Sequence, residues 1–149
     1  MMKLTSPHFD VNGEIPSRYT CDGTNINPTL HIEGVPIKAK SLVLIMDDPD
    51  AVPVAGKVWD HWIVFNVPPE TKTIAEGKEP IGTHGVGTGG NLEYAGPCPP
   101  DRKHRYYFKL YALDVVLGLE EGAMKVEVEK AMQGHILDKV ELVGRYERS

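Results

Sequence analysis

Four polar side chains of this sequence lie in or directly beside segments that are otherwise apolar. They are a carboxylate, two imidazoles and a phenol: Asp48, His61, His104 and Tyr106. Burying a carboxylate or an imidazole is unfavourable unless another group pairs with it, so each of these residues needs a partner or a purpose. Imidazole and phenol groups can donate hydrogen bonds to an anion, and a carboxylate can orient an imidazole or accept a proton. Together, the four would form a small polar site.

Three short segments rich in β-branched and aromatic residues contain or adjoin these side chains. They run from Ser41 to Met46, from Val58 to Val67 and from His104 to Leu113, between stretches broken by Gly and Pro. Their composition predicts β-strands. Because neighbouring residues along each segment are apolar, both faces are expected to be buried, as in strands in the middle of a sheet.

The alternation of side chains along these strands bears on whether the four polar groups meet. The residues that share the parity of each polar group are Leu42, Leu44 and Met46 for Asp48; Trp59, Ile63, Phe65 and Val67 for His61; and Phe108, Leu110 and Ala112 for His104 and Tyr106. If these faces point the same way, the polar groups converge at one edge of the core. Each histidine can alternatively be a satisfied core residue, and Asp48 can be a turn residue in Asp47-Asp48-Pro49-Asp50.

The rest of the chain supplies a helix and a final strand. Apolar residues at helical spacing predict a helix from about Ala123 to Leu137, and Lys139 to Tyr146 follows as a strand. Gly and Pro occur throughout, without a break in composition that would mark a linker. We therefore expect one domain over residues 1–149, mainly β. Its architecture is predicted to be an antiparallel β-sandwich with a few short peripheral helices, one of them near the C-terminus.

Composition excludes several classes of partner. The net charge is −5 and Lys and Arg are scattered, so a nucleic acid partner is not expected. No segment approaches the roughly 18 unbroken apolar residues of a membrane span. The first twenty residues lack the apolar run of a secretory signal, which predicts a cytoplasmic protein.

The two cysteines, Cys21 and Cys98, permit either one disulfide or two free thiols. Free thiols are the expectation for a cytoplasmic protein of a mesophile, and a hyperthermophile would reverse it. The sequence alone does not choose between them.

Local motifs for common chemistries are absent or out of context. Residues 85–90 fit G-x-G-x-x-G, but the segment that follows will not start a helix, so a loop is expected. There is no G-x-S-x-G, H-E-x-x-H or Walker lysine. A zinc site would need Asp48 beside His61 and His104, and neither a metal nor a cofactor is predicted.

Four segments resemble the phosphatidylethanolamine-binding protein family, also called Raf kinase inhibitor proteins, in its shorter prokaryotic branch. They are Asp48-Pro49-Asp50-Ala51-Val52-Pro53, His61-Trp62, Gly96-Pro97-Cys98-Pro99-Pro100 and His104-Arg105-Tyr106. Similar segments at both ends extend the resemblance over nearly the whole chain. The resemblance implies a β-sandwich with a small pocket that takes up phosphate, a phospho-headgroup or a carboxylate.

The resemblance also implies which residues form the pocket. The expected ligand-binding residues are Asp48, His61, Cys98 through its backbone N–H, His104 and Tyr106. The expected pocket rim consists of Asp50, Gly96, Pro97, Pro99 and Pro100. Asp48 would repel a dianion, so it is expected to orient an imidazole or to accept a proton from the ligand. Binding should then weaken as pH rises and the imidazoles lose their protons.

Three functions fit this pattern. The first is a binding or regulatory protein, not an enzyme, that recognises an anionic group on a small molecule or on a partner such as a kinase. The second is a protease inhibitor that acts through a surface loop. The third is a hydrolase of small esters or phosphates that uses Asp48 with His61 or His104 as acid and base. A homodimer is the oligomeric state that the resemblance suggests.

Overall fold

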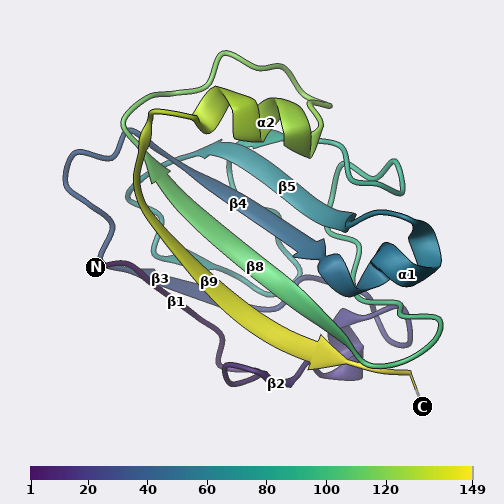
Figure 1. Cartoon of the computed structure of the whole chain (residues 1–149). Coiled ribbons are helices and arrows are strands. Elements are labelled where there is room, and N and C mark those ends of the chain that lie inside the picture. The colour runs from purple at the N-terminus through teal and green to yellow at the C-terminus, as the bar shows by residue number, and fades with distance from the viewer. Residues whose placement is uncertain (149) are drawn as a thin grey trace.

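The computed structural model describes residues 1–148, most of which lie in strands and the loops between them (Figure 1). The strands are β1 (Lys3–Thr5), β2 (Gly13–Glu14), β3 (Leu30–Glu33), β4 (Ser41–Asp48), β5 (Trp59–Val67), β6 (Thr73–Ile74), β7 (Thr83–His84), β8 (His104–Leu113) and β9 (Ile136–Tyr146). The helical segments are the 3-10 turns η1 (Ser17–Tyr19) and η2 (Pro49–Ala51) and the α-helices α1 (Val52–Ala55) and α2 (Lys125–Met132).

The strands form two sheets that pack face to face. The larger has the order β2-β9-β8-β4-β5-β7 and the smaller the order β1-β3-β6. All pairs are antiparallel except the short parallel pair of β2 with β9. The predicted mainly β sandwich with few short helices is therefore confirmed. The three segments predicted to lie in the middle of a sheet are β4, β5 and β8, and none of them is an edge strand of the large sheet.

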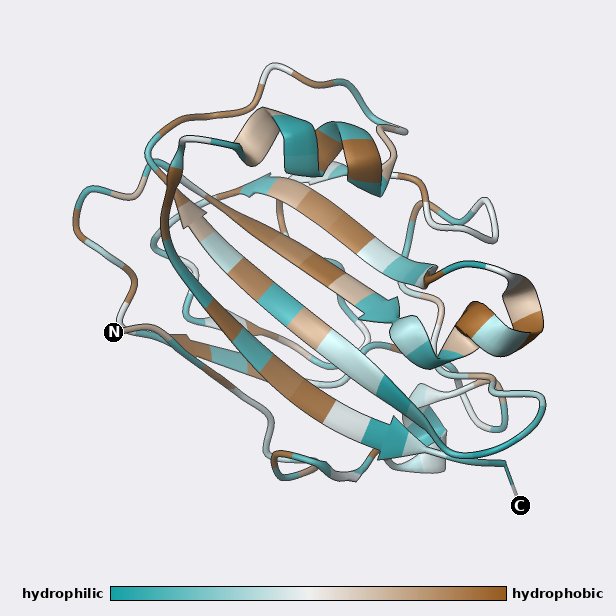
Figure 2. Cartoon of the chain, viewed as in Figure 1, coloured by the Kyte–Doolittle hydropathy of each residue, from teal (hydrophilic) through white to brown (hydrophobic). Residues whose placement is uncertain are grey.

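Each face of the large sheet covers its own apolar core. Between the two sheets lie side chains that include Leu4, Ile32, Leu42, Leu44, Met46, Trp62, Val64, Phe108 and Leu110. On the opposite face, Val128 and Met132 of α2 pack against the sheet residues Val43, Ile45, Ile63, Phe65 and Leu113. Figure 2 shows the consequence in β4 and β5, where successive residues are hydrophobic because both faces are covered.

The boundaries of most predicted elements agree with the structure, but the C-terminal ones differ. The helix predicted to reach Leu137 ends at Met132, and β9 begins at Ile136. Gly134 adopts the left-handed conformation, with φ of 81°, which reverses the chain after the helix. Ile136 continues the helical spacing of apolar residues, yet it pairs with Leu113 in the sheet. The helical spacing of apolar residues therefore did not reveal where the helix ends.

The longest helix in residues 1–148 is α2, with eight residues. None of the helices in this part of the chain is long and apolar enough to cross a membrane.

Candidate functional site

A cavity of about 500 Å³ opens where β4 ends and β5 and β8 begin, beside α1 and the loop before β8. Its lining residues are Cys21, Asn25, Asp48, Ala51, Val54, Ala55, Trp59, His61, Gly89, Asn91, Ala95, Gly96, Cys98, Pro99, Pro100, His104 and Tyr106. Asp48, His61, His104 and Tyr106 are all among them. Their convergence, predicted only as a hypothesis, is present in the structure.

The imidazole of His104 lies between two carboxyl groups. Its Nδ1 is 2.6 Å from Oδ2 of Asp48, and its Nε2 is 2.7 Å from Oδ1 of Asp101. Carboxylate oxygens only accept hydrogen bonds, so the ring donates from both nitrogens when it is an imidazolium. If the ring is neutral, one carboxyl group must carry the shared proton. In both cases the three side chains together have a net charge of about −1.

Asp48 is the fixed member of this group. It is 3% exposed, and its Oδ1 accepts a hydrogen bond of 2.9 Å from the backbone N–H of Asp50 at the start of η2. Burial raises the pKa of Asp48, and the hydrogen bond from His104 only partly opposes that shift. Asp48 therefore holds the His104 ring in one orientation and can share its proton.

His61 reaches the cavity because β5 contains a bulge. In the pairing of β4 with β5, Met46 lies opposite Trp62 and Asp47 lies opposite Asp60, which leaves His61 as the extra residue. Simple alternation placed His61 on the face of Ile63, which packs beneath α2, and this prediction was wrong. The bulge turns His61 towards the ring of Tyr106, at a centroid distance of 5.3 Å.

A second irregularity explains another error of parity on the same strand. Asn66 has a positive φ of 55°, and the register shifts between the Leu42 and Leu44 pairs. Val67 consequently joins the core between the sheets, whereas Phe65 joins the core beneath α2. Alternation predicted one face for both residues.

The protonation of His61 follows from its surroundings. Its Nδ1 lies 2.7 Å from the carbonyl oxygen of Ala95, which can only accept, so Nδ1 carries the hydrogen. Burial lowers the pKa of His61 and favours the neutral ring, although the Ala95 bond opposes this. In the neutral ring Nε2 is an acceptor, and none of residues 1–148 forms a hydrogen bond with it.

Tyr106 lies between the two histidine rings. It is 0% exposed, and its hydroxyl has no hydrogen-bond partner among residues 1–148. Burial, followed by the nearby charge of Asp48, raises the pKa of Tyr106, so the phenol keeps its proton. A buried hydroxyl without a partner is unfavourable, and at a cavity wall it is a donor available to a ligand.

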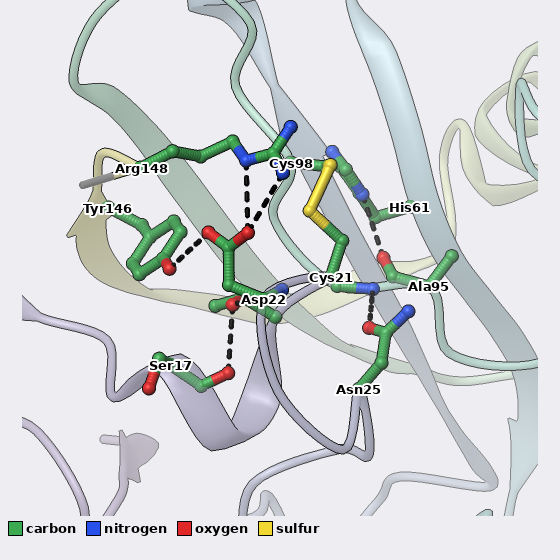
Figure 3. Close-up of a disulfide and its surroundings, with 11 residues drawn as sticks. Ser17, Cys21, Asp22, Asn25, His61, Ala95, Cys98, Tyr146 and Arg148 are labelled. Atoms are coloured by element: carbon green, nitrogen blue, oxygen red, sulfur yellow. Dashed lines mark hydrogen bonds and ion pairs between the residues drawn. A yellow bond between two sulfur atoms is a disulfide. The ribbon is translucent and has the colours of Figure 1, made fainter.

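The cavity rim is tied to the N-terminal part of the chain by a disulfide between Cys21 and Cys98 (Figure 3). The sequence left open whether these cysteines are bonded, and the structure decides for the disulfide, because packing places two cysteines that are 77 residues apart side by side. Gly96 is required at this contact, since a Cβ would lie 2.1 Å from the carbonyl oxygen of Tyr19. The Gly96 N–H donates to the side chain of Asn25 and is not available to a ligand.

Sequence comparison assigns the chain to a family. The family model described as phosphatidylethanolamine-binding protein matches residues 5–147. The chain belongs to this family. It is 52% identical to a UPF0098 protein of Methanothermobacter thermautotrophicus and 48% identical to one of Chlamydia trachomatis, with 99% of each chain covered in both cases.

Solved structures of other family members have the same fold. A homolog from Chlamydia trachomatis superposes with a TM-score of 0.94 at 47% identity, covering 99% of this chain and 98% of that one. Escherichia coli YbcL, described as a new member of the mammalian family, gives 0.90 at 26% identity with 99% of each covered. The resemblance found from short motifs is thus confirmed over the whole fold.

Some of the rim residues expected from the family pattern lie elsewhere. Asp50 does not line the cavity, because its carboxylate receives hydrogen bonds from the guanidinium and the backbone N–H of Arg105. These bonds lower the pKa of Asp50 to about 2. Pro97 is also outside the lining and accepts from the Cys21 N–H, whereas Gly96, Cys98, Pro99 and Pro100 line the cavity.

Several residues in or beside the cavity were missed by sequence reasoning. Asp101 is the most important, and its position three residues before His104 was the only signal for it. Val54, Ala55 and Trp59 form an apolar side of the cavity, which alternation and composition did not reveal. No group of three or more His, Cys, Asp or Glu side chains in residues 1–148 is arranged to hold a metal ion.

Proposed function

We propose that the cavity binds a small ligand through a phosphate, a phospho-headgroup or a carboxylate, and that the protein works by binding rather than by turnover. Membership of the phosphatidylethanolamine-binding protein family supports a binding function in general. The observation that most directly supports an anionic ligand is the Tyr106 hydroxyl. It is a buried donor at the cavity wall and has no hydrogen-bond partner among residues 1–148.

The other cavity groups favour a monoanion over a dianion. Tyr106 donates to one ligand oxygen, and the backbone N–H of Cys98 is a second donor on the rim. Neutral His61 instead offers an acceptor at Nε2, which suits a ligand P–OH group. Asp48 is close to both histidines and would repel a second negative charge.

The apolar side of the cavity indicates what is attached to the anionic group. Val54, Ala55, Trp59 and the two rim prolines provide carbon surface next to the polar base. A ligand with an organic substituent would remove this surface from water and gain about 25 cal/mol for each Å² buried. Phosphate esters should therefore bind more tightly than inorganic phosphate.

The proposal is tested by titrating phosphoethanolamine and inorganic phosphate while following histidine ring signals by NMR. Tyr106→Phe should weaken binding about tenfold or more, since a hydrogen bond to a charged group contributes about 1.5–3 kcal/mol. Tyr111→Phe is the matched control, because Tyr111 lies on the same strand but packs in the core beneath α2. Equal binding by wild type and Tyr106→Phe, or no saturable shift at millimolar ligand, would refute the proposal.

A further inference from the structure

The nitrogen of His104 that faces away from Asp48 is blocked by the protein's own carboxylate. Asp101 Oδ1 lies 2.7 Å from His104 Nε2, and the His104 side chain is only 1% exposed. Both ring nitrogens are therefore in use. No ligand atom can form a hydrogen bond with Nε2 until Asp101 moves away.

The two carboxylates beside His104 differ in how firmly they are held. Asp48 ends strand β4, is buried and is anchored by the Asp50 N–H. The Asp101 side chain is 34% exposed, and the residue lies in the loop before β8, outside any strand or helix. Of the two, Asp101 is the one that can leave at low cost in burial.

A hollow next to Asp101 could accommodate its carboxylate after the carboxylate leaves His104. This hollow, of about 320 Å³, lies on the other side of the Pro99–Pro100 rim. Besides Asp101, its charged lining residues are Arg102 and Arg148 together with Asp22 and Glu147. The Arg102 Nε is already 3.8 Å from the second oxygen of Asp101. After leaving His104, the carboxylate would lie in water beside the guanidinium of Arg102, since Arg148 already pairs with Asp22. A negative charge is well tolerated in water next to a cation.

Charge balance favours exchange over addition. Asp48, His104 and Asp101 carry about one net negative charge, so an anion added to all three would bring the group to about −2. An anion that replaces Asp101 on His104 leaves the charge at about −1. The exchange also keeps a hydrogen-bond acceptor on Nε2, so no buried donor loses its partner.

We propose that Asp101 is an internal competitor for oxyanion ligands, which bind His104 by displacing the Asp101 carboxylate from Nε2 into the neighbouring hollow beside Arg102. This inference rests on the proposed function and adds a residue that sets the affinity of the same cavity. Asp101 would thereby reject weakly held anions and admit those whose additional contacts compensate for opening the loop.

The size of the effect depends on how often the loop is open without ligand. When only a fraction of molecules is competent, the apparent dissociation constant is the intrinsic one divided by that fraction. If about one molecule in ten is open, removing the competing carboxylate tightens binding about tenfold. Asp101→Ala should show the full gain, and Asp101→Asn a smaller one because its amide oxygen can still accept from Nε2.

The test compares affinities for inorganic phosphate by titration calorimetry at about pH 6, where an ordinary histidine is mostly protonated. Wild type, Asp101→Ala, Asp101→Asn and Asp101→Ala in a His104→Ala background are measured together. Asp114→Ala is the matched control, since Asp114 also pairs with a histidine, at 2.9 Å from His135 Nδ1, but outside the cavity. We expect tighter binding in Asp101→Ala, no change in Asp114→Ala, and no gain where His104 is absent.

The outcomes separate this inference from the proposed function. If wild type binds phosphate and Asp101→Ala binds it with equal or lower affinity, the proposal that Asp101 is an internal competitor is overturned. The proposed anion binding then still stands. A gain that persists without His104 also overturns it, because the displacement would then not occur at Nε2. An absence of binding in wild type and in Asp101→Ala alike refutes both proposals.

Discussion

Asp47 and Asp48 are neighbours at the end of β4, equally buried at 2% and 3% exposure, and they point to opposite faces of the same sheet. Asp47 accepts from two lysines, with Lys109 Nζ at 3.0 Å and Lys125 Nζ at 3.1 Å. Asp48 instead accepts from the imidazole of His104 at the base of the cavity. Neither the residue type nor the extent of burial distinguishes them.

The partner distinguishes the two carboxylates. A lysine ammonium keeps its charge at neutral pH, so Asp47 belongs to a fixed ion cluster, which also includes Asp60 at 2.7 Å from Lys125. The pKa of Lys125 is raised, because Asp60 and Asp47 outweigh the lowering effect of burial. An imidazole can gain or lose its proton near neutrality, so Asp48 belongs to a group that can respond to a ligand.

Asp47→Asn should produce the largest effect, and it should be on stability. It leaves Lys109 facing a neutral amide in a partly buried place and leaves Lys125 with Asp60 alone, and we expect a loss of about 3 kcal/mol in the free energy of unfolding. Urea denaturation measures this loss, and phosphate affinity should stay within twofold of wild type. The distinction between the two aspartates would be contradicted if the free energy of phosphate binding changed by more than the free energy of unfolding.

Asp50→Asn sharpens the comparison with a third carboxylate, which pairs with Arg105 at the surface. Charge-assisted hydrogen bonds of this kind contribute about 1.5–3 kcal/mol, so we expect a loss of about 2 kcal/mol at pH 7. Because the pKa of Asp50 is lowered to about 2, its contribution is complete above its unfolded pKa and disappears as pH falls towards 2.

Urea midpoints measured from pH 7 down to pH 2 test this dependence. The wild type and Asp50→Asn curves should converge at the acidic end. A difference between them that stays constant with pH would show that the Asp50 carboxylate contributes no charge-dependent stability.

Asp48→Asn should produce the smallest change in stability and a clear change in affinity. Burial raises the pKa of Asp48, so its ionised form adds little to folding, and the loss should stay below about 1 kcal/mol. Without a carboxylate to fix the ring of His104, phosphate affinity should fall about tenfold, measured by calorimetry. The reverse pattern, lost stability with unchanged affinity, would place Asp48 in the same structural role as Asp47.

Much of the fold and of the site could be predicted because it depends on local pattern. Runs of β-branched and aromatic residues located β4, β5 and β8, since strand formation and two-sided burial leave a clear trace in sequence. Asp48, His104 and Tyr106 follow simple alternation from these strands, and the structure brings them to one cavity. Motif resemblance then identified the family.

The remaining features depend on contacts between distant residues, which only the tertiary structure decides. The bulge that turns His61 into the cavity arises from the register between β4 and β5, and a shift of one residue reverses the face of a side chain. The Cys21–Cys98 disulfide and the position of Asp101 on His104 depend on how loops pack across the sandwich. Sequence determined which groups could meet, and packing decided which carboxylate met a lysine and which met a histidine.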